Sequence, residues 1–234
     1  MTILDKILFA QDFASTSKQL ESVAASLASS FNSTIVPMHV LPDDIVNPKV
    51  KDLLDDTANS RLEATTKTLQ QSNVTVEKPI IKYGTPYDQI VMTASSVNAN
   101  MILVGSGESN AGEKFKLGTT TKRIIQRSEK PVMVIKEDSN LNVKTILCPV
   151  DFSSPSERAL KNALIFARRF KSELIILSVS ELTTSSWFTS EEDLAEENKQ
   201  RAKAHAKQFD DFLKNVNLEG VNWTREERSG NPAL

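Results

Sequence analysis

The chain has 234 residues, of which 39% are hydrophobic and 25% are charged, and its formal net charge is −2. This balance excludes the basic stripes that are typical of nucleic-acid binding, and the length suits two small domains. The opening segment lacks a basic leader with a long apolar core, and no apolar run approaches the roughly 20 residues that span a bilayer. We therefore expect a cytoplasmic protein that binds neither nucleic acid nor a membrane.

The first half of the chain alternates short apolar runs with longer helical patterns. The runs are apolar almost throughout, as expected of strands that are covered on both faces. Between the first two runs, apolar residues recur at helical spacing, and Thr16 with Gln19 predicts a capping box there. Such alternation predicts a doubly wound α/β fold with a five-stranded parallel sheet in the order 3-2-1-4-5. The predicted strands are Ile3–Ala10, Thr34–Leu41, Val74–Ile81, Met101–Gly105 and Val132–Ile135.

The second half of the chain repeats the first. The segment that begins "ILFAQDF" aligns without a gap with the one that begins "ILCPVDF", at an offset of 139 residues that places Asp12 over Asp151. Further on, "YGTP" matches "SGNP". Because internal repeats of this kind indicate two copies of one fold, we predict domains over residues 1–139 and 140–234. The second copy lacks counterparts of the fourth and fifth strands, so we expect it to be incomplete at its C-terminus.

The helices of the second copy carry clear start signals. Ser154, Pro155 and Glu157 predict the start of its first helix, with Ser154 as the cap. Ser190 opens a long charged segment that predicts a second helix with a solvated face. The residues of this helix expected to point inward are Leu194, Phe209, Phe212 and Val216.

Two loops hold residues that are suited to a ligand, and they follow the first and fourth predicted strands. Open α/β sheets bind ligands where the strand order reverses, and these two loops would meet there. Asp12 in the first loop suits a sugar or base, and it equally suits the end of a strand and the cap of a helix. The second loop, "VGSGESNAGEKFKLGTT", combines glycines with hydroxyl residues whose backbone N–H groups can hold an anion. Glu108 places a carboxylate among them.

The sequence contains no recognisable catalytic motif. His39 ends an apolar strand and His205 lies on a charged helix, Gly-x-Ser-x-Gly is absent, and the glycine loop has no Walker lysine. The single cysteine, Cys148, excludes an internal disulfide and a cysteine-rich metal site. We therefore expect a protein that is not an enzyme and that has no metal ligands.

Taken together, the first-strand aspartate, the Gly-x-Pro before the third helix and a loop of the form Gly-x2-Gly-x9-Gly-[Ser/Thr] resemble the universal stress protein family. In this chain Glu108 stands where that pattern has its second glycine. The resemblance implies tandem domains of an adenine-nucleotide fold, with ATP or a related nucleotide as the ligand. It implies that the aspartate and the end of the second strand meet the adenosine, while the glycine loop meets the phosphates. The residues concerned are Asp12, Val40, Gly105, Gly107, Glu108, Gly118, Thr119 and Thr120.

Two functions follow from this resemblance and remain open at this point. One is a stress-response regulatory protein whose first domain binds ATP, weakly because the Glu108 carboxylate repels phosphate. The other is a nucleotide-free family member that acts only as a dimerising interaction module. In either case the apolar edge strand "KPVMVI" predicts a homodimer or an intramolecular pseudo-dimer, because unpaired strand edges are usually covered.

Overall fold

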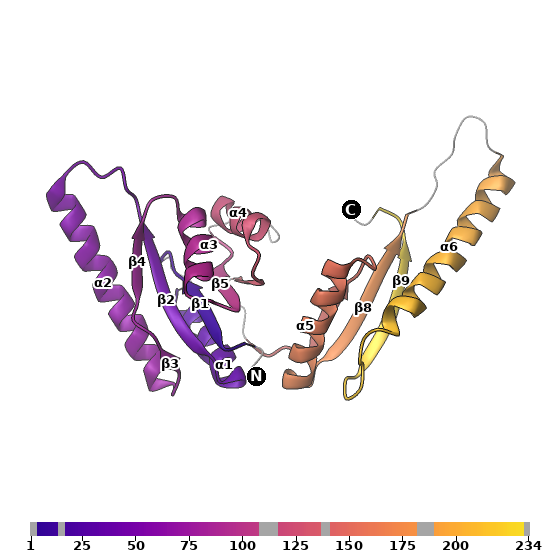
Figure 1. Cartoon of the computed structure of the whole chain (residues 1–234), viewed down its shortest axis with the longest axis horizontal. Coiled ribbons are helices and arrows are strands. Elements are labelled where there is room, and N and C mark those ends of the chain that lie inside the picture. Colours follow the sequence, from indigo (N-terminus) through magenta and orange to yellow (C-terminus); the bar gives the residue numbers. More distant parts are fainter. Residues whose placement is uncertain (1–3, 14–16, 108–116, 137–140, 182–189, 232–234) are drawn as a thin grey trace. The chain divides into compact units, whose positions relative to one another are not determined.

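The computed structural model describes residues 4–13, 17–107, 117–136, 141–181 and 190–231. The chain divides into two compact units, residues 1–141 and 142–234 (Figure 1). We call them the first unit and the second unit and describe each by itself.

The first unit is built on a parallel sheet in the order β3-β2-β1-β5-β6, with β4 also paired to β2 (Figure 1). The chain runs outward from β1 to β4 and then returns to β5 on the other side of β1, so the predicted doubly wound α/β class is confirmed. The strands are β1 (Lys6–Ala10), β2 (Thr34–Leu41), β3 (Thr75–Val76), β4 (Ile80–Tyr83), β5 (Met101–Gly105) and β6 (Val132–Ile135).

The third predicted strand was wrong in one respect, because it is divided into β3 and β4. Val76 at the end of β3 pairs with Ile35, whereas Ile80 at the start of β4 pairs with Met38. The chain therefore carries one residue more than β2 over this stretch, which is a bulge. Pro79 lies in the gap and has no N–H to donate to a sheet, so it favours an interruption there.

The helices of the first unit begin at recognisable signals. Asn47 caps α2, because its side-chain oxygen accepts the N–H of Lys49 at 3.0 Å, and Pro48 follows as the first helical residue. The predicted cap Thr16 lies outside the described residues. The helices are α1 (Ser17–Phe31), α2 (Pro48–Gln71), α3 (Pro86–Ser96) and α4 (Thr119–Arg127).

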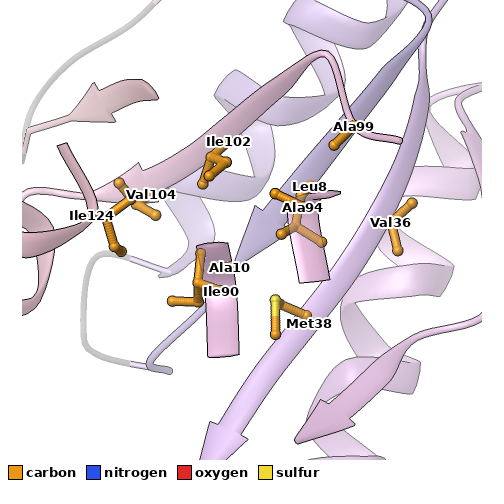
Figure 2. Packing of buried hydrophobic residues seen from close by; sticks show 10 residues of the cluster. All are labelled: Leu8, Ala10, Val36, Met38, Ile90, Ala94, Ala99, Ile102, Val104 and Ile124. Carbon is orange, nitrogen blue, oxygen red and sulfur yellow. The ribbon is translucent and has the colours of Figure 1, made fainter. Parts of the chain in front are cut away.

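Two pairs of helices cover the two faces of this sheet. Residues along a strand point alternately to opposite faces, and one set packs against Ile90 and Ala94 of α3 and Ile124 of α4 (Figure 2). Ile7 and Phe9 are fully buried on the opposite face, which α1 and α2 cover. The strand residues that pack under α3 and α4 are Leu8, Ala10, Val36, Met38, Ile102 and Val104.

The second unit has a smaller parallel sheet, in the order β7-β8-β9. Its first helix is capped by Ser153, whose side chain accepts the N–H of Ser156, so the expected cap at Ser154 was one residue late. Ser190 caps the long second helix as predicted, by accepting the N–H of Asp193. The elements are β7 (Thr145–Pro149), α5 (Ser154–Phe170), β8 (Glu173–Ser180), α6 (Glu191–Leu213) and β9 (Trp223–Ser229).

Strand pairing extends the repeat beyond the part that the sequence aligns. Ile35 pairs with Val76 in the first unit, and its counterpart Leu174 pairs with Trp223 in the second. Over the second helix and the strand that follows it, the offset between the two units is therefore 147 residues rather than 139, and it becomes 146 after the extra residue between β3 and β4. The offset of 147 residues places the buried α2 residues Ala58, Leu62, Thr65 and Leu69 over His205, Phe209, Phe212 and Val216.

Within the described part of the chain, none of the helices is both long enough and apolar enough to cross a membrane.

Candidate functional site

A cavity of about 380 Å³ opens in the first unit at the carboxyl ends of β1, β2 and β5. Its position follows from the topology, because β1 lies between two strands whose connections run to opposite sides of the sheet. The starts of α3 and α4 close its other walls. The described residues that line it are Ala10, Gln11, Asp12, Met38, His39, Val40, Pro86, Ile90, Val104, Gly105, Gly107, Gly118, Thr119, Thr120, Thr121 and Ile124.

The structure brings together residues that the sequence predicted separately. Seven of the eight predicted site residues line this cavity, although they come from three segments of the chain: the loop after β1, the end of β2, and the stretch from the end of β5 to the start of α4. Glu108, the eighth, lies outside the described residues. The seven are Asp12, Val40, Gly105, Gly107, Gly118, Thr119 and Thr120.

The glycine loop is closed at its base by direct contact between backbone atoms. A Cβ added to Gly107, whose φ is +79°, would lie 3.0 Å from the Cα of Gly118. The N–H of Gly118 donates to the carbonyl of Ser106 at 2.8 Å, and a Cβ on Gly118 would lie 3.2 Å from the Cα of Gly107. These two glycines are therefore required by the close approach of the chain to itself. Gly105 is different, because a Cβ there would make only an ordinary contact with Leu20.

Helix α4 begins at the cavity wall without a side-chain cap. Gly118 occupies the capping position and offers no side chain, so the first N–H groups of the helix are left for another acceptor. Thr119 and Thr120 are exposed beside them, while Thr121 is turned inward and donates its hydroxyl to the carbonyl of Gly105 at 2.9 Å. The arrangement places N–H donors and hydroxyl groups on one side of the cavity, as an anion requires.

The loop after β1 is held by a histidine and an arginine. His39 Nδ1 donates to the carbonyl of Gln11 at 2.7 Å, and its ring lies 4.4 Å from the ring of Phe13. Phe13 has a φ of +59°, and Arg61 of α2 both covers its ring and donates to its carbonyl at 3.2 Å. These contacts fix the turn from which Asp12 reaches the mouth of the cavity. His39 thus positions the loop that carries Asp12.

Sequence reasoning missed the residues that form the floor of the cavity. Met38, Val104 and Ile124 are buried and, with Ile90 of α3, present an apolar surface that suits a flat ring. They appeared in the sequence only as core positions of strands and helices. Apolar residues at the end of a buried strand carry no separate signal for a ligand.

The second unit has a wider cavity of about 960 Å³ beside the ends of β7 and β8. Asp151, the counterpart of Asp12, lies on its wall, and hydrogen bonds from Ser153 and Ser156 hold the pKa of that carboxyl at about 2. Within the described residues of this unit, nothing corresponds to the base of the glycine loop. Burial raises the pKa of the Cys148 thiol, as expected of an inert core cysteine.

Ser178, His205 and Glu227 are aligned in the second unit in the manner of a hydrolytic triad. His205 Nε2 lies 3.0 Å from Ser178 Oγ, and its Nδ1 lies 3.3 Å from a Glu227 oxygen. However, Ser178 is only 2% exposed and donates its hydroxyl to the carbonyl of Val150 at 2.9 Å. That hydroxyl proton is directed into the fold, so the serine is not arranged as a nucleophile. The described residues also contain no group of acidic, histidine or cysteine side chains able to hold a metal ion.

The sequence profile of the universal stress protein family matches residues 4–136 and, a second time, residues 142–234. The universal stress protein MJ0577 of Methanocaldococcus jannaschii is 33% identical over 93 residues, which is 39% of this chain and 56% of that protein's length. The solved structure of MJ0577 gives a TM-score of 0.52 at 25% identity, over 59% of this chain and 99% of that one. A universal stress protein from Archaeoglobus fulgidus gives a TM-score of 0.69 at 18% identity, over 97% of this chain and 79% of that one.

Proposed function

Because the chain belongs to the universal stress protein family and matches the family profile twice, we propose that its first unit binds an adenine nucleotide such as ATP. The protein would then be a cytoplasmic regulatory module of the stress response rather than an enzyme, with nucleotide occupancy as its signal. One observation carries the proposal, namely the convergence of seven predicted residues on one cavity of the first unit.

The chemistry of the cavity supports a nucleotide with its base inward. The floor of the cavity is apolar, and its 380 Å³ suits a nucleoside better than a whole triphosphate. Asp12 lies at the mouth, where a ribose hydroxyl would be able to donate to its carboxylate. The uncapped start of α4 faces the same space and suits a phosphate.

Calorimetric titration of the full chain with ATP, adenosine and GTP tests this proposal. We expect ATP and adenosine to bind in the first unit, and a Gly107→Ala variant to lose both ligands, since its new Cβ would press on Gly118. Asp151→Asn, at the matching position of the second unit, serves as the control and should leave the titration unchanged.

We also propose that the carboxylate of Glu108 weakens the binding of phosphate by charge repulsion. Two unit charges about 4 Å apart interact by about 1 kcal/mol in water and by about 4 kcal/mol at an effective dielectric near 20. Replacing Glu108 with glycine should therefore tighten ATP by about tenfold and leave adenosine unchanged. If neither the parent chain nor this variant binds ATP at millimolar concentration, the second function holds, that of a nucleotide-free interaction module.

We also propose that β6 forms an association surface, in a homodimer or a pseudo-dimer of two similar units. Val132, Met133 and Val134 are only half-buried, and among the described strands β6 pairs with β5 alone. An edge strand of this kind invites a partner. Val132→Lys and Val134→Lys should shift the sedimentation coefficient toward that of a monomer, and an unchanged coefficient would contradict the proposal.

A further inference from the structure

The described residues that line the cavity of the first unit provide little positive charge to balance a phosphate ligand. Among the described residues that line it, Asp12 is the one charged carboxylate, and none is a lysine or an arginine. Backbone N–H groups at the start of α4 contribute only partial positive charge. A triphosphate would be held more tightly if a side chain close to the wall added a full positive charge.

Arg123 is placed to supply that charge by the geometry of α4. It follows Thr120 by three positions and Thr119 by four, so its side chain neighbours these two lining residues on the surface of the helix. Thr121 and Ile124 are buried toward the sheet, which leaves Arg123 exposed on the flank beside α3.

Tyr87, in the first turn of α3, packs against this arginine. The ring of Tyr87 lies 4.9 Å from the guanidinium carbon of Arg123, and Tyr87 directly follows Pro86, which lines the cavity. Stacking on an aromatic ring restricts the side chain while its charge remains intact. Less side-chain freedom is then lost when a ligand arrives.

Arg127 packs on the same ring, but its charge is paired with a carboxylate. Arg127 lies 4.8 Å from the centre of the Tyr87 ring, but it also forms an ion pair with Asp88 at 2.9 Å. Within the described part of the chain, no carboxylate lies at ion-pair distance from Arg123. Arg123 therefore has no carboxylate partner among the described residues. It is also nearer along the helix to Thr119 and Thr120 than Arg127 is.

We propose that Arg123, held by Tyr87, binds the phosphates of the nucleotide and makes the first unit selective for nucleotides over nucleosides. This inference rests on the proposed nucleotide site. Arg123 lies outside the glycine loop, and its charge would distinguish a nucleotide from an uncharged nucleoside.

The test compares Arg123→Gln with Lys122→Gln, which removes the same charge from the adjacent, exposed position. Both variants and the parent chain are titrated with ATP and with adenosine, with and without Mg²⁺. Arg123→Gln should weaken ATP by about fivefold and leave adenosine unchanged, whereas Lys122→Gln should alter ATP by less than about twofold. The gap between the variants should narrow in 0.5 M salt, since salt screens exposed charges.

Arg123→Lys separates a charge effect from a packing effect. It keeps the positive charge and gives up the planar guanidinium, so it should recover part of the ATP affinity. Equal ATP affinities for Arg123→Gln and Lys122→Gln would overturn the inference while the nucleotide site stands. A parent chain that binds neither ATP nor adenosine would instead overturn the nucleotide site itself.

Discussion

The two units repeat one arrangement of strands and helices, but they fill the space between sheet and helices with different chemistry. In the first unit Thr65 donates to Glu21 at 2.5 Å and lies 3.1 Å from the side-chain oxygen of Gln11. The matching residues of the second unit are Val150, Leu160 and Phe212, which are all buried in its apolar cluster. The same backbone arrangement is thus supported by three polar residues that hydrogen-bond one another in the first unit and by three apolar residues that pack together in the second.

The two units also place a histidine differently, on a strand in the first unit and on a helix in the second. In the first unit the two matching positions hold His39 on β2 and Ala58 on α2, and His39 donates to the carbonyl of Gln11. In the second unit Ser178 takes the strand position and His205 the helix position, and Ser178 satisfies the matching carbonyl of Val150. The carbonyl that ends the first strand is satisfied in both units, although by different residues.

The two units differ in how the other face of the sheet is covered. Leu8 is fully buried under α3 and α4, whereas its counterpart Leu147 is 58% exposed. The cavity of the first unit lies on this face, between the sheet and the starts of those two helices. The repeat thus preserves the core between the sheet and its first two helices. The proposed nucleotide site depends on α3, α4 and β5, whose counterparts are not among the described elements of the second unit.

The largest expected effect comes from placing the polar chemistry of the first unit into the second. Leu160→Glu buries a carboxylate among apolar side chains and should destabilise the second unit by about 3 to 5 kcal/mol. Both tryptophans, Trp187 and Trp223, belong to the second unit, so tryptophan fluorescence during urea unfolding reports on it selectively. Leu160→Met, which conserves volume, is the control and should cost less than about 1.5 kcal/mol. An unshifted fluorescence transition for Leu160→Glu would mean that the two cores are interchangeable.

Two left-handed glycines, one in each unit, provide the next comparison. Gly107 and Gly220 have similar φ values of +79° and +73°, but only at Gly107 would a Cβ meet another backbone. Gly107→Ala should cost about 2 to 3 kcal/mol, and Gly220→Ala about 1 kcal/mol, which is the conformational strain alone. Thermal unfolding followed by far-UV circular dichroism measures both. Equal losses would show that the contact with Gly118 adds nothing to the strain.

A smaller loss is expected when the polar trio of the first unit is broken. Glu21→Leu removes the acceptor of the Thr65 hydroxyl and should destabilise the first unit by about 1 to 2 kcal/mol. The triple variant Gln11→Val, Glu21→Leu, Thr65→Val replaces all three members and should recover most of this loss. Urea unfolding followed by circular dichroism tests the pair, and a triple variant weaker than the single one would show that the trio itself is needed.

The smallest effect is a pH dependence of the second unit. The Asp151 carboxyl has a pKa of about 2, below the value of about 3.9 expected in the unfolded chain. A lowered carboxyl pKa stabilises the folded state above about pH 4, and this contribution is lost as the pH falls toward 2. Asp151→Asn should therefore flatten the decline in stability over this window, as measured by tryptophan fluorescence in urea. A decline as steep as that of the parent chain would assign the acid sensitivity to other carboxyls.

The sequence by itself determined the class of the fold, the existence of the repeat and most of the candidate site. Apolar runs, the pattern around Asp12 and the glycine spacing each depend on neighbours along the chain, and such local signals are visible without a structure. The cap of α5 was predicted one residue late, because Ser153 and Ser154 both suit that role. The third strand was predicted as one continuous run, Val74–Ile81, and its interruption at Pro79 was not predicted.

Tertiary structure alone decided which residues meet across the fold. The stacking of Arg123 on Tyr87 and the apolar floor that includes Met38 join segments far apart in the chain, and the contact between Gly107 and Gly118 joins the two ends of one loop. The exchange of His39 for His205 also became visible only when strand pairing set the second offset. Such contacts depend on side-chain packing between elements rather than on local preference, and a single sequence carries no separate record of that packing.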